Sequence, residues 1–127
     1  MIKNFLVLLF LFSFNLYANN ENSILSKAKI EDKKILVYVT SKYCFYCKKM
    51  DSEVLSLDEI KDKISKNFVY LKIDTQEDKL PFNLQKEYKK ITPSFFFLDK
   101  NGKYLKQYPG SWTKEDFILI LKENIDE

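Results

Sequence analysis

The only two cysteines of the chain, Cys44 and Cys47, have the spacing Cys-x-x-Cys, which can support redox chemistry. They directly follow a β-like apolar run over residues 35–40 and directly precede a helical pattern. This placement predicts that Cys44 lies at a helix N-terminus, where backbone N–H groups and the helix dipole stabilise a thiolate. Cys47, one turn further on, shares that helix face and can attack a mixed disulfide formed at Cys44. We therefore expect Cys44 to be the nucleophile and Cys47 the resolving thiol.

Two other uses of this cysteine pair remain open. The pair could form a structural disulfide, although closing such a short loop stabilises a fold only a little. It could also supply half of a zinc or copper site. The chain contains no His and no further Cys, so a four-ligand site of that kind cannot be completed within one chain. We expect no bound metal and no cofactor.

The composition of the chain excludes several classes of function. Its 127 residues suffice for one domain with one core. All its basic residues are Lys, which argues against bidentate recognition of bases or phosphates and hence against a nucleic-acid partner. The lack of His also removes Ser-His-Asp triads and Cys-His nucleophile pairs.

The N-terminal stretch has the pattern of a secretory signal peptide. Lys3 supplies a positive charge, residues 5–14 are almost entirely apolar, and Ala18 precedes a polar segment. This pattern predicts a signal peptide over residues 1–18, cleavage near Ala18, and a mature domain over residues 19–127 in the periplasm. An uncleaved membrane anchor is the alternative, although the apolar run is short for a bilayer.

The remaining chain alternates between helical and strand-like patterns. Strands are expected where short apolar or β-branched runs occur, and helices where apolar residues recur every three or four positions. The expected strands are residues 35–40, 68–73, 94–98 and 104–108, the last two joined by a hairpin loop over residues 99–102. The expected helices are residues 22–29, the segment after the cysteines with Met50, Val54, Leu55 and Leu57, a short helix with Ile60 and Ile64, a helix from Pro81 through Leu84 and Tyr88, and a last helix after the capping box at Thr113, with Phe117, Ile118, Leu121 and Ile125 as its apolar face.

This order of elements predicts an α/β fold. The first two strands need a crossover connection and therefore a parallel pairing, whereas the last two form an antiparallel hairpin. We expect a mixed sheet of four to five strands with helices on both faces.

On three signals the chain resembles the thioredoxin superfamily over roughly residues 22–125. They are the Cys-x-x-Cys at 44–47, the Thr92-Pro93 dipeptide just before a strand, and Gly110 after the last strand. The resemblance implies the thioredoxin fold, with a cis proline at Pro93 that faces the cysteine pair. The runs over residues 47–50 and 95–103 look most like exported bacterial thioredoxin-like reductases and the thioredoxin-like end domain of membrane thiol conduits.

Three positions depart from the family pattern. Phe45-Tyr46 stands between the cysteines where thioredoxin has Gly-Pro, and Tyr43 replaces a Trp. Tyr38 occupies the position at which thioredoxins bury an acid that assists the second thiol. The sequence therefore leaves the proton acceptor for Cys47 unassigned.

Together these observations predict a periplasmic thiol–disulfide oxidoreductase that works mainly as a reductase. The resemblance implies that substrate peptide lies along Thr92 and Pro93, and Phe45 and Tyr46 form either an apolar docking patch or merely tolerated surface aromatics. Expected partners are protein disulfides and a membrane thiol-reductant conduit, with the protein itself a monomer. The alternatives are a thiol oxidase of secreted proteins and a non-catalytic binding or chaperone module of the same fold.

Overall fold

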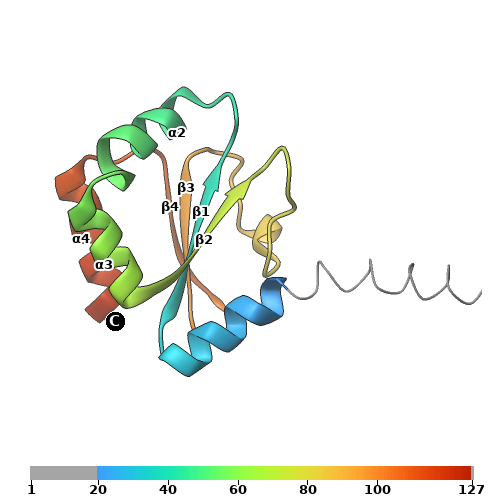
Figure 1. The fold of residues 1–127 in the computed structure, drawn as a ribbon. Coiled ribbons are helices and arrows are strands. Elements are labelled where there is room, and N and C mark those ends of the chain that lie inside the picture. The colour runs from blue at the N-terminus through green and yellow to red at the C-terminus, as the bar shows by residue number, and fades with distance from the viewer. Residues whose placement is uncertain (1–19, 127) are drawn as a thin grey trace, which may run out of the picture.

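A mixed sheet of four strands forms the centre of the protein (Figure 1). The structure, a computed structural model, describes residues 20–126, so the predicted signal peptide lies outside the described residues. The strands lie in the order β2-β1-β3-β4, with β1 parallel to β2 and the other neighbours antiparallel. This arrangement confirms the predicted mixed thioredoxin-like sheet. The strands are β1 Lys34–Thr40, β2 Phe68–Asp74, β3 Ser94–Leu98 and β4 Tyr104–Pro109.

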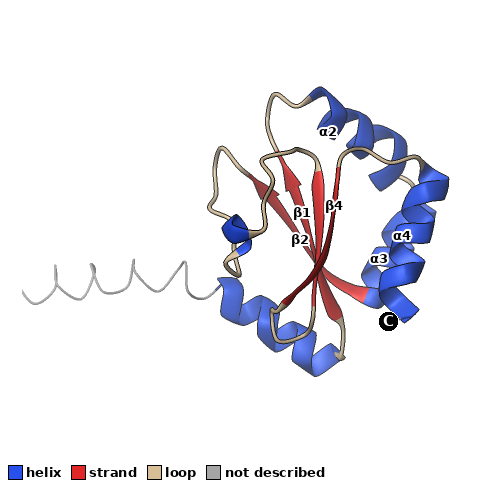
Figure 2. Ribbon diagram, turned by 180° about the vertical axis from the view of Figure 1, so that it is seen from behind, coloured by secondary structure: helices blue, strands red, loops and turns tan. Residues whose placement is uncertain are grey.

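Helices cover both faces of this sheet (Figures 1 and 2). One face carries α2 (Phe45–Met50) and its π-helical continuation η1 (Asp51–Leu55), together with α3 (Asp58–Asn67) and α4 (Lys114–Asp126). The other face carries a leading helix over residues 20–31 and a short 3₁₀ turn, η2 (Leu84–Lys86). Within residues 20–126, no helix is both long and apolar enough to cross a bilayer.

The central strand β1 contributes to two separate cores because successive side chains of a strand point to opposite faces. Leu36 and Tyr38 lie in the core beneath α2, α3 and α4. Ile35, Val37 and Val39 lie in the core beneath the leading helix and η2. β1 and β3 are thus buried on both faces. The carboxyl end of β1 and the amino end of β3, which lie side by side, therefore form a rigid support for the site.

The expected helix from Pro81 through Tyr88 is wrong, because only the single turn η2 forms there. Phe82 and Asn83 both have φ of 57°, in the left-handed region, which a right-handed helix cannot include. Lys90 has the same φ. The segment therefore takes an irregular path toward β3 and packs only Leu84 fully into the core.

The last helix begins as expected but buries a different face. The Thr113 hydroxyl accepts a hydrogen bond from the Asp116 N–H at 3.2 Å, which confirms the cap. The buried positions are Phe117, Ile120, Leu121 and Asn124, an i, i+3, i+4, i+7 stripe, while Ile125 is exposed and Ile118 only half-buried. Burial of the polar Asn124 is offset by hydrogen bonds from its amide to the Ile120 carbonyl and the Tyr108 hydroxyl.

Candidate active site at the Cys-x-x-Cys motif

The cysteine pair lies at one end of the sheet, where the carboxyl ends of β1 and β2 meet the amino end of β3. β1 and β2 are parallel, and Thr40 pairs with Asp74 at their carboxyl ends. β3 is antiparallel to β1, and Val39 pairs with Ser94, the first residue of β3. The segments that follow β1 and precede β3 are therefore neighbours, which brings the cysteines close to Thr92 and Pro93.

Cys44 is the N-cap residue of α2. Its backbone is extended, with φ −89° and ψ 113°, and its sulfur accepts a hydrogen bond from the Cys47 N–H at 3.2 Å. A cap in this position satisfies a backbone donor that the helix itself leaves unpaired. Both cysteines are free thiols; Cys44 is partly exposed, whereas Cys47 is only 1% exposed.

The two thiols have opposite acidities. Partial burial opposes ionisation of Cys44, but hydrogen bonds from the Cys47 thiol, the Thr92 side chain and the backbone of Cys47 and Tyr46 outweigh it and lower the pKa of Cys44. Burial raises the pKa of Cys47, and so does its hydrogen bond to Cys44. The exposed sulfur is therefore the more easily ionised one.

Thr92, in the segment before β3, lies against Cys44, and Pro93 follows it. In its thiol form Cys44 donates to the Thr92 carbonyl oxygen at 3.4 Å. The Thr92–Pro93 peptide bond is cis and Pro93 is buried. The Gly110 N–H donates to the Pro93 carbonyl oxygen at 2.7 Å, and Gly110 has φ of +100°, a conformation that favours glycine. This hydrogen bond from Gly110 therefore holds Pro93 in place.

Three aromatic side chains are exposed around Cys44. Phe45 is 72% exposed and Tyr46 is 58% exposed, and their rings meet edge to face with centroids 5.4 Å apart. Tyr43, just before Cys44, is also exposed, and the Lys42 ammonium lies 5.8 Å from its ring centroid. Exposed apolar residues gathered around a reactive thiol are typical of a docking surface for another chain.

Tyr38 fills the space beneath Cys47. Its side chain is fully buried, its ring stacks on Phe95 at 4.9 Å, and its hydroxyl donates to the Cys47 carbonyl oxygen at 3.4 Å. Burial raises the pKa of Tyr38, so its hydroxyl keeps its proton at neutral pH. Tyr38 is therefore a donor and a packing residue, and it cannot take a proton from Cys47.

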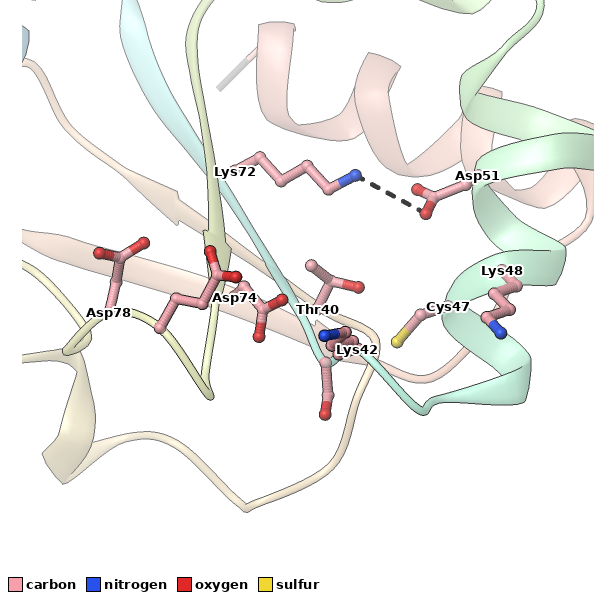
Figure 3. A pocket seen from close by; sticks show the side chains of 10 residues that line it. Thr40, Lys42, Cys47, Lys48, Asp51, Lys72, Asp74 and Asp78 are labelled. Carbon is pink, nitrogen blue, oxygen red and sulfur yellow. Dashed lines mark ion pairs between the residues drawn. The ribbon is translucent and has the colours of Figure 1, made fainter.

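A cavity of about 460 Å³ lies beside Cys47, between α2 and the carboxyl ends of β1 and β2 (Figure 3). Asp51 and Lys72 line it and form an ion pair with 3.7 Å between carboxylate oxygen and ammonium nitrogen. Sequence reasoning missed both residues. The Cys47–Asp51 spacing of four residues on one helix was the available signal, whereas nothing local indicated Lys72. In the described part of the chain, no three His, Cys, Asp or Glu side chains gather in a way that could hold a metal ion.

The family described as thioredoxin-like domain matches residues 22–125. The chain belongs to the thioredoxin-like family. No curated protein matches it in sequence. Among solved structures, a thioredoxin from Thermus thermophilus superposes with a TM-score of 0.69 at 22% identity, covering 80% of this chain and 81% of that one. The oxidised C-terminal domain of DsbD from Neisseria meningitidis superposes with a TM-score of 0.69 at 19% identity, covering 85% and 95%.

A further neighbour is the DsbH oxidoreductase, with a TM-score of 0.63 at 22% identity over 81% of this chain and 79% of that one. At these identities the solved structures establish the thioredoxin-like fold. The family match, the fold and the Cys44-x-x-Cys47 dithiol together make this thioredoxin-like protein a thiol–disulfide oxidoreductase.

Proposed function

We propose that the protein is a periplasmic thiol–disulfide oxidoreductase that acts as a monomer and mainly reduces protein disulfides. The observation that carries the exchange chemistry is the asymmetry of the two thiols. Cys44 is accessible and has a lowered pKa, and Cys47 is buried behind it with a raised pKa. The export of the protein is supported by the signal-peptide pattern of residues 1–18.

In the proposed reaction the Cys44 thiolate attacks one sulfur of a substrate disulfide. A Cys44–substrate disulfide forms, and the other substrate sulfur leaves as a thiolate, which takes up a proton. Cys47 then loses its proton and attacks Cys44, forming the Cys44–Cys47 disulfide and releasing the second substrate thiolate. Two electrons pass from the protein dithiol to the substrate.

Two surfaces beside Cys44 support docking of an extended substrate. Thr92 lies outside the sheet and its carbonyl oxygen is within 3.4 Å of the reacting sulfur, so its backbone can pair with a peptide strand. Phe45 and Tyr46 directly follow Cys44 in the chain and expose their rings to solvent. We assign substrate binding to these residues and to Pro93, which supports Thr92.

The reducing direction is supported by what surrounds the Cys44 thiolate. Its stabilisation comes from hydrogen bonds, and no His stands between the cysteines. Lys42 and Lys48 are exposed, so their charges are screened by solvent. A modestly stabilised thiolate leaves the reduced form only modestly favoured, and such a couple donates electrons.

The test is the equilibrium of the Cys44–Cys47 couple with glutathione, measured on the purified protein. We expect a potential nearer to the roughly −270 mV of thioredoxin than to the roughly −120 mV of a strong periplasmic oxidant. A value close to the oxidant would overturn the reductase proposal in favour of the thiol oxidase. Because an oxidising compartment traps the disulfide form, a reductase there also needs a membrane conduit that supplies electrons.

A further inference from the structure

Resolution by Cys47 needs a group that receives its proton. Cys47 must lose a proton before it attacks the mixed disulfide, and burial raises its pKa. Tyr38, at the position where thioredoxins bury an acid, keeps its own proton, and its hydroxyl donates to the Cys47 carbonyl oxygen. The acceptor must therefore be another residue that lines the space beside the sulfur.

The cavity beside Cys47 contains such a group. In Figure 3 the Cys47 sulfur and the Asp51 carboxylate both project from the same helix toward the strands. Asp51 follows Cys47 by one turn, and its backbone N–H donates to the Cys47 carbonyl oxygen, so the two side chains share a helix face. The Asp51 side chain is 38% exposed, so solvent in the cavity reaches its carboxylate.

Lys72 holds this carboxylate in position. Its ammonium nitrogen lies 3.7 Å from Asp51 and 5.7 Å from the centre of the Tyr38 ring, and Lys72 pairs with Tyr38 across β1 and β2. The ammonium therefore lies near both the tyrosine ring and the carboxylate. A carboxylate oxygen is a proton acceptor, so Asp51 has the chemistry that this step requires.

The other charged groups that face this cavity lie on different elements. Lys42 and Lys48 flank the sulfur from the cysteine loop and α2, and Asp74, Glu77 and Asp78 lie at the end of β2 and in the loop after it. Asp74 accepts a hydrogen bond from the Gln76 N–H at 2.9 Å, so its carboxylate stabilises its own turn. Among these acids, Asp51 alone is on the helix of Cys47.

We propose that Asp51, oriented by Lys72, accepts the proton of Cys47 through cavity solvent when Cys47 attacks the Cys44 mixed disulfide. The Cys47 S–H bond breaks, its proton passes to the carboxylate, and its sulfur bonds to Cys44 as the substrate thiolate leaves. Asp51 then returns the proton to solvent or to the leaving thiolate. Lys72 is a positioning residue. The assignment rests on the exchange chemistry of the dithiol and not on the reducing direction proposed above.

Stopped-flow reaction of the reduced full chain with one equivalent of dithiobis(nitrobenzoate) separates the two steps. The first coloured thiolate appears when Cys44 attacks, and the second when Cys47 resolves the mixed disulfide. For Asp51→Asn we expect an unchanged first phase and a second phase slowed about tenfold near pH 7. This is less than the roughly hundredfold typical of a general base, because the Asp51 carboxylate is partly solvated. The unchanged first phase also shows that the helix of Cys44 is intact.

The pH profile distinguishes proton transfer from a structural effect. The second phase of Asp51→Asn should rise about tenfold per pH unit with the thiolate fraction and meet the native rate in alkaline solution, where Cys47 ionises unaided. Asp51→Glu should restore the native profile. Asp78→Asn, which removes the same charge from the same cavity, is the matched control and should leave both phases unchanged.

Three results would overturn the proposal. The first is that Asp51→Asn and Asp78→Asn have the same pH profile of the second phase. The second is that Asp51→Asn slows the second phase by the same factor at every pH. The third is that loss of the Asp51 charge makes the second phase faster. Because the small disulfide reports exchange without any protein substrate, failure here leaves the proposed reductase function untouched. If the measured potential is reducing and Asp51→Asn leaves the second phase unchanged, only the role of Asp51 is rejected.

Discussion

The Cys44 sulfur lies 3.4 Å from the carbonyl oxygen of Thr92, a residue 48 positions further along the chain. This contact joins the loop after β1 to the loop before β3 at the end of the sheet where these two strands are neighbours. A peptide that pairs with the Thr92 backbone would present its disulfide directly to the nucleophile.

Alkylation should distinguish the two cysteines in the native reduced protein. The lowered pKa of Cys44 means a larger thiolate fraction at neutral pH, so its alkylation should reach half its maximal rate below pH of about 8.5. The raised pKa and burial of Cys47 should place its half-maximum above that value. Mass spectrometry of the two labelled positions across pH measures both rates, and faster labelling of Cys47 would reverse the assigned roles.

Single substitutions of the cysteines should block different steps. Cys44→Ser should abolish disulfide exchange because no nucleophile remains exposed. Cys47→Ser should instead accumulate mixed disulfides with substrate, since the attack that releases product is missing. Non-reducing gels of protein mixed with a disulfide substrate reveal the adducts, and adducts on Cys44→Ser would contradict the scheme.

The residues between the cysteines should set the potential. Replacing Phe45-Tyr46 by Pro-His places an imidazole beside Cys44, which stabilises its thiolate and hence the reduced form. We expect the potential to rise by about 30 mV or more, a tenfold shift in equilibrium against glutathione. The double variant Phe45→Leu, Tyr46→Phe adds no charge and should keep the native potential; an equal shift there would assign the effect to packing.

The same aromatic pair should also contribute to substrate binding. Changing both Phe45 and Tyr46 to Ser should raise the KM for reduction of a protein disulfide several-fold, since two exposed apolar rings are lost from the docking surface. The first phase with dithiobis(nitrobenzoate) controls for altered thiol reactivity. A similar loss with the small reagent would show that the rings act on the thiol and not on docking.

Gly110→Ala should destabilise the fold although a methyl group has open space there. Gly110 has φ of +100°, and nothing lies within 4 Å of an added Cβ, so the cost is backbone strain of about 1–2 kcal/mol. Its N–H bonds to the Pro93 carbonyl, so reduction of protein substrates should weaken as well. Denaturant unfolding measures the loss, and Lys103→Ala, an exposed control, should stay within about 0.5 kcal/mol of the native value.

The N-terminus of the exported protein tests the localisation. Mass spectrometry of the mature protein should find a start at or near Asn19, because the pattern over residues 1–18 predicts cleavage after Ala18. Recovery only from the cytoplasm, with Met1 retained, would contradict the periplasmic assignment.

The parts of the site that sequence could predict are those with local signals. The cysteine spacing after an apolar strand and the Thr92-Pro93 dipeptide each mark a position on a short stretch of chain, and the structure brings them into contact. The irregular path at Phe82 and Asn83 escaped because apolar periodicity does not carry the sign of φ. The Asp51–Lys72 pair escaped because packing of a helix against a strand creates it, and neither residue is unusual alone.

Tyr38, beneath Cys47, affects how the protein responds to a change of pH. Tyr38 keeps its proton well above neutrality, and the chain has no His anywhere, so no side chain of those two types changes charge on passing from a mildly acidic to a mildly alkaline medium. Ordinary carboxylates ionise below that interval and lysines above it. Apart from the N-terminal amine, the groups that can change charge across that interval are therefore the two thiols, and a pH-dependent change in the activity of this enzyme reports their ionisation.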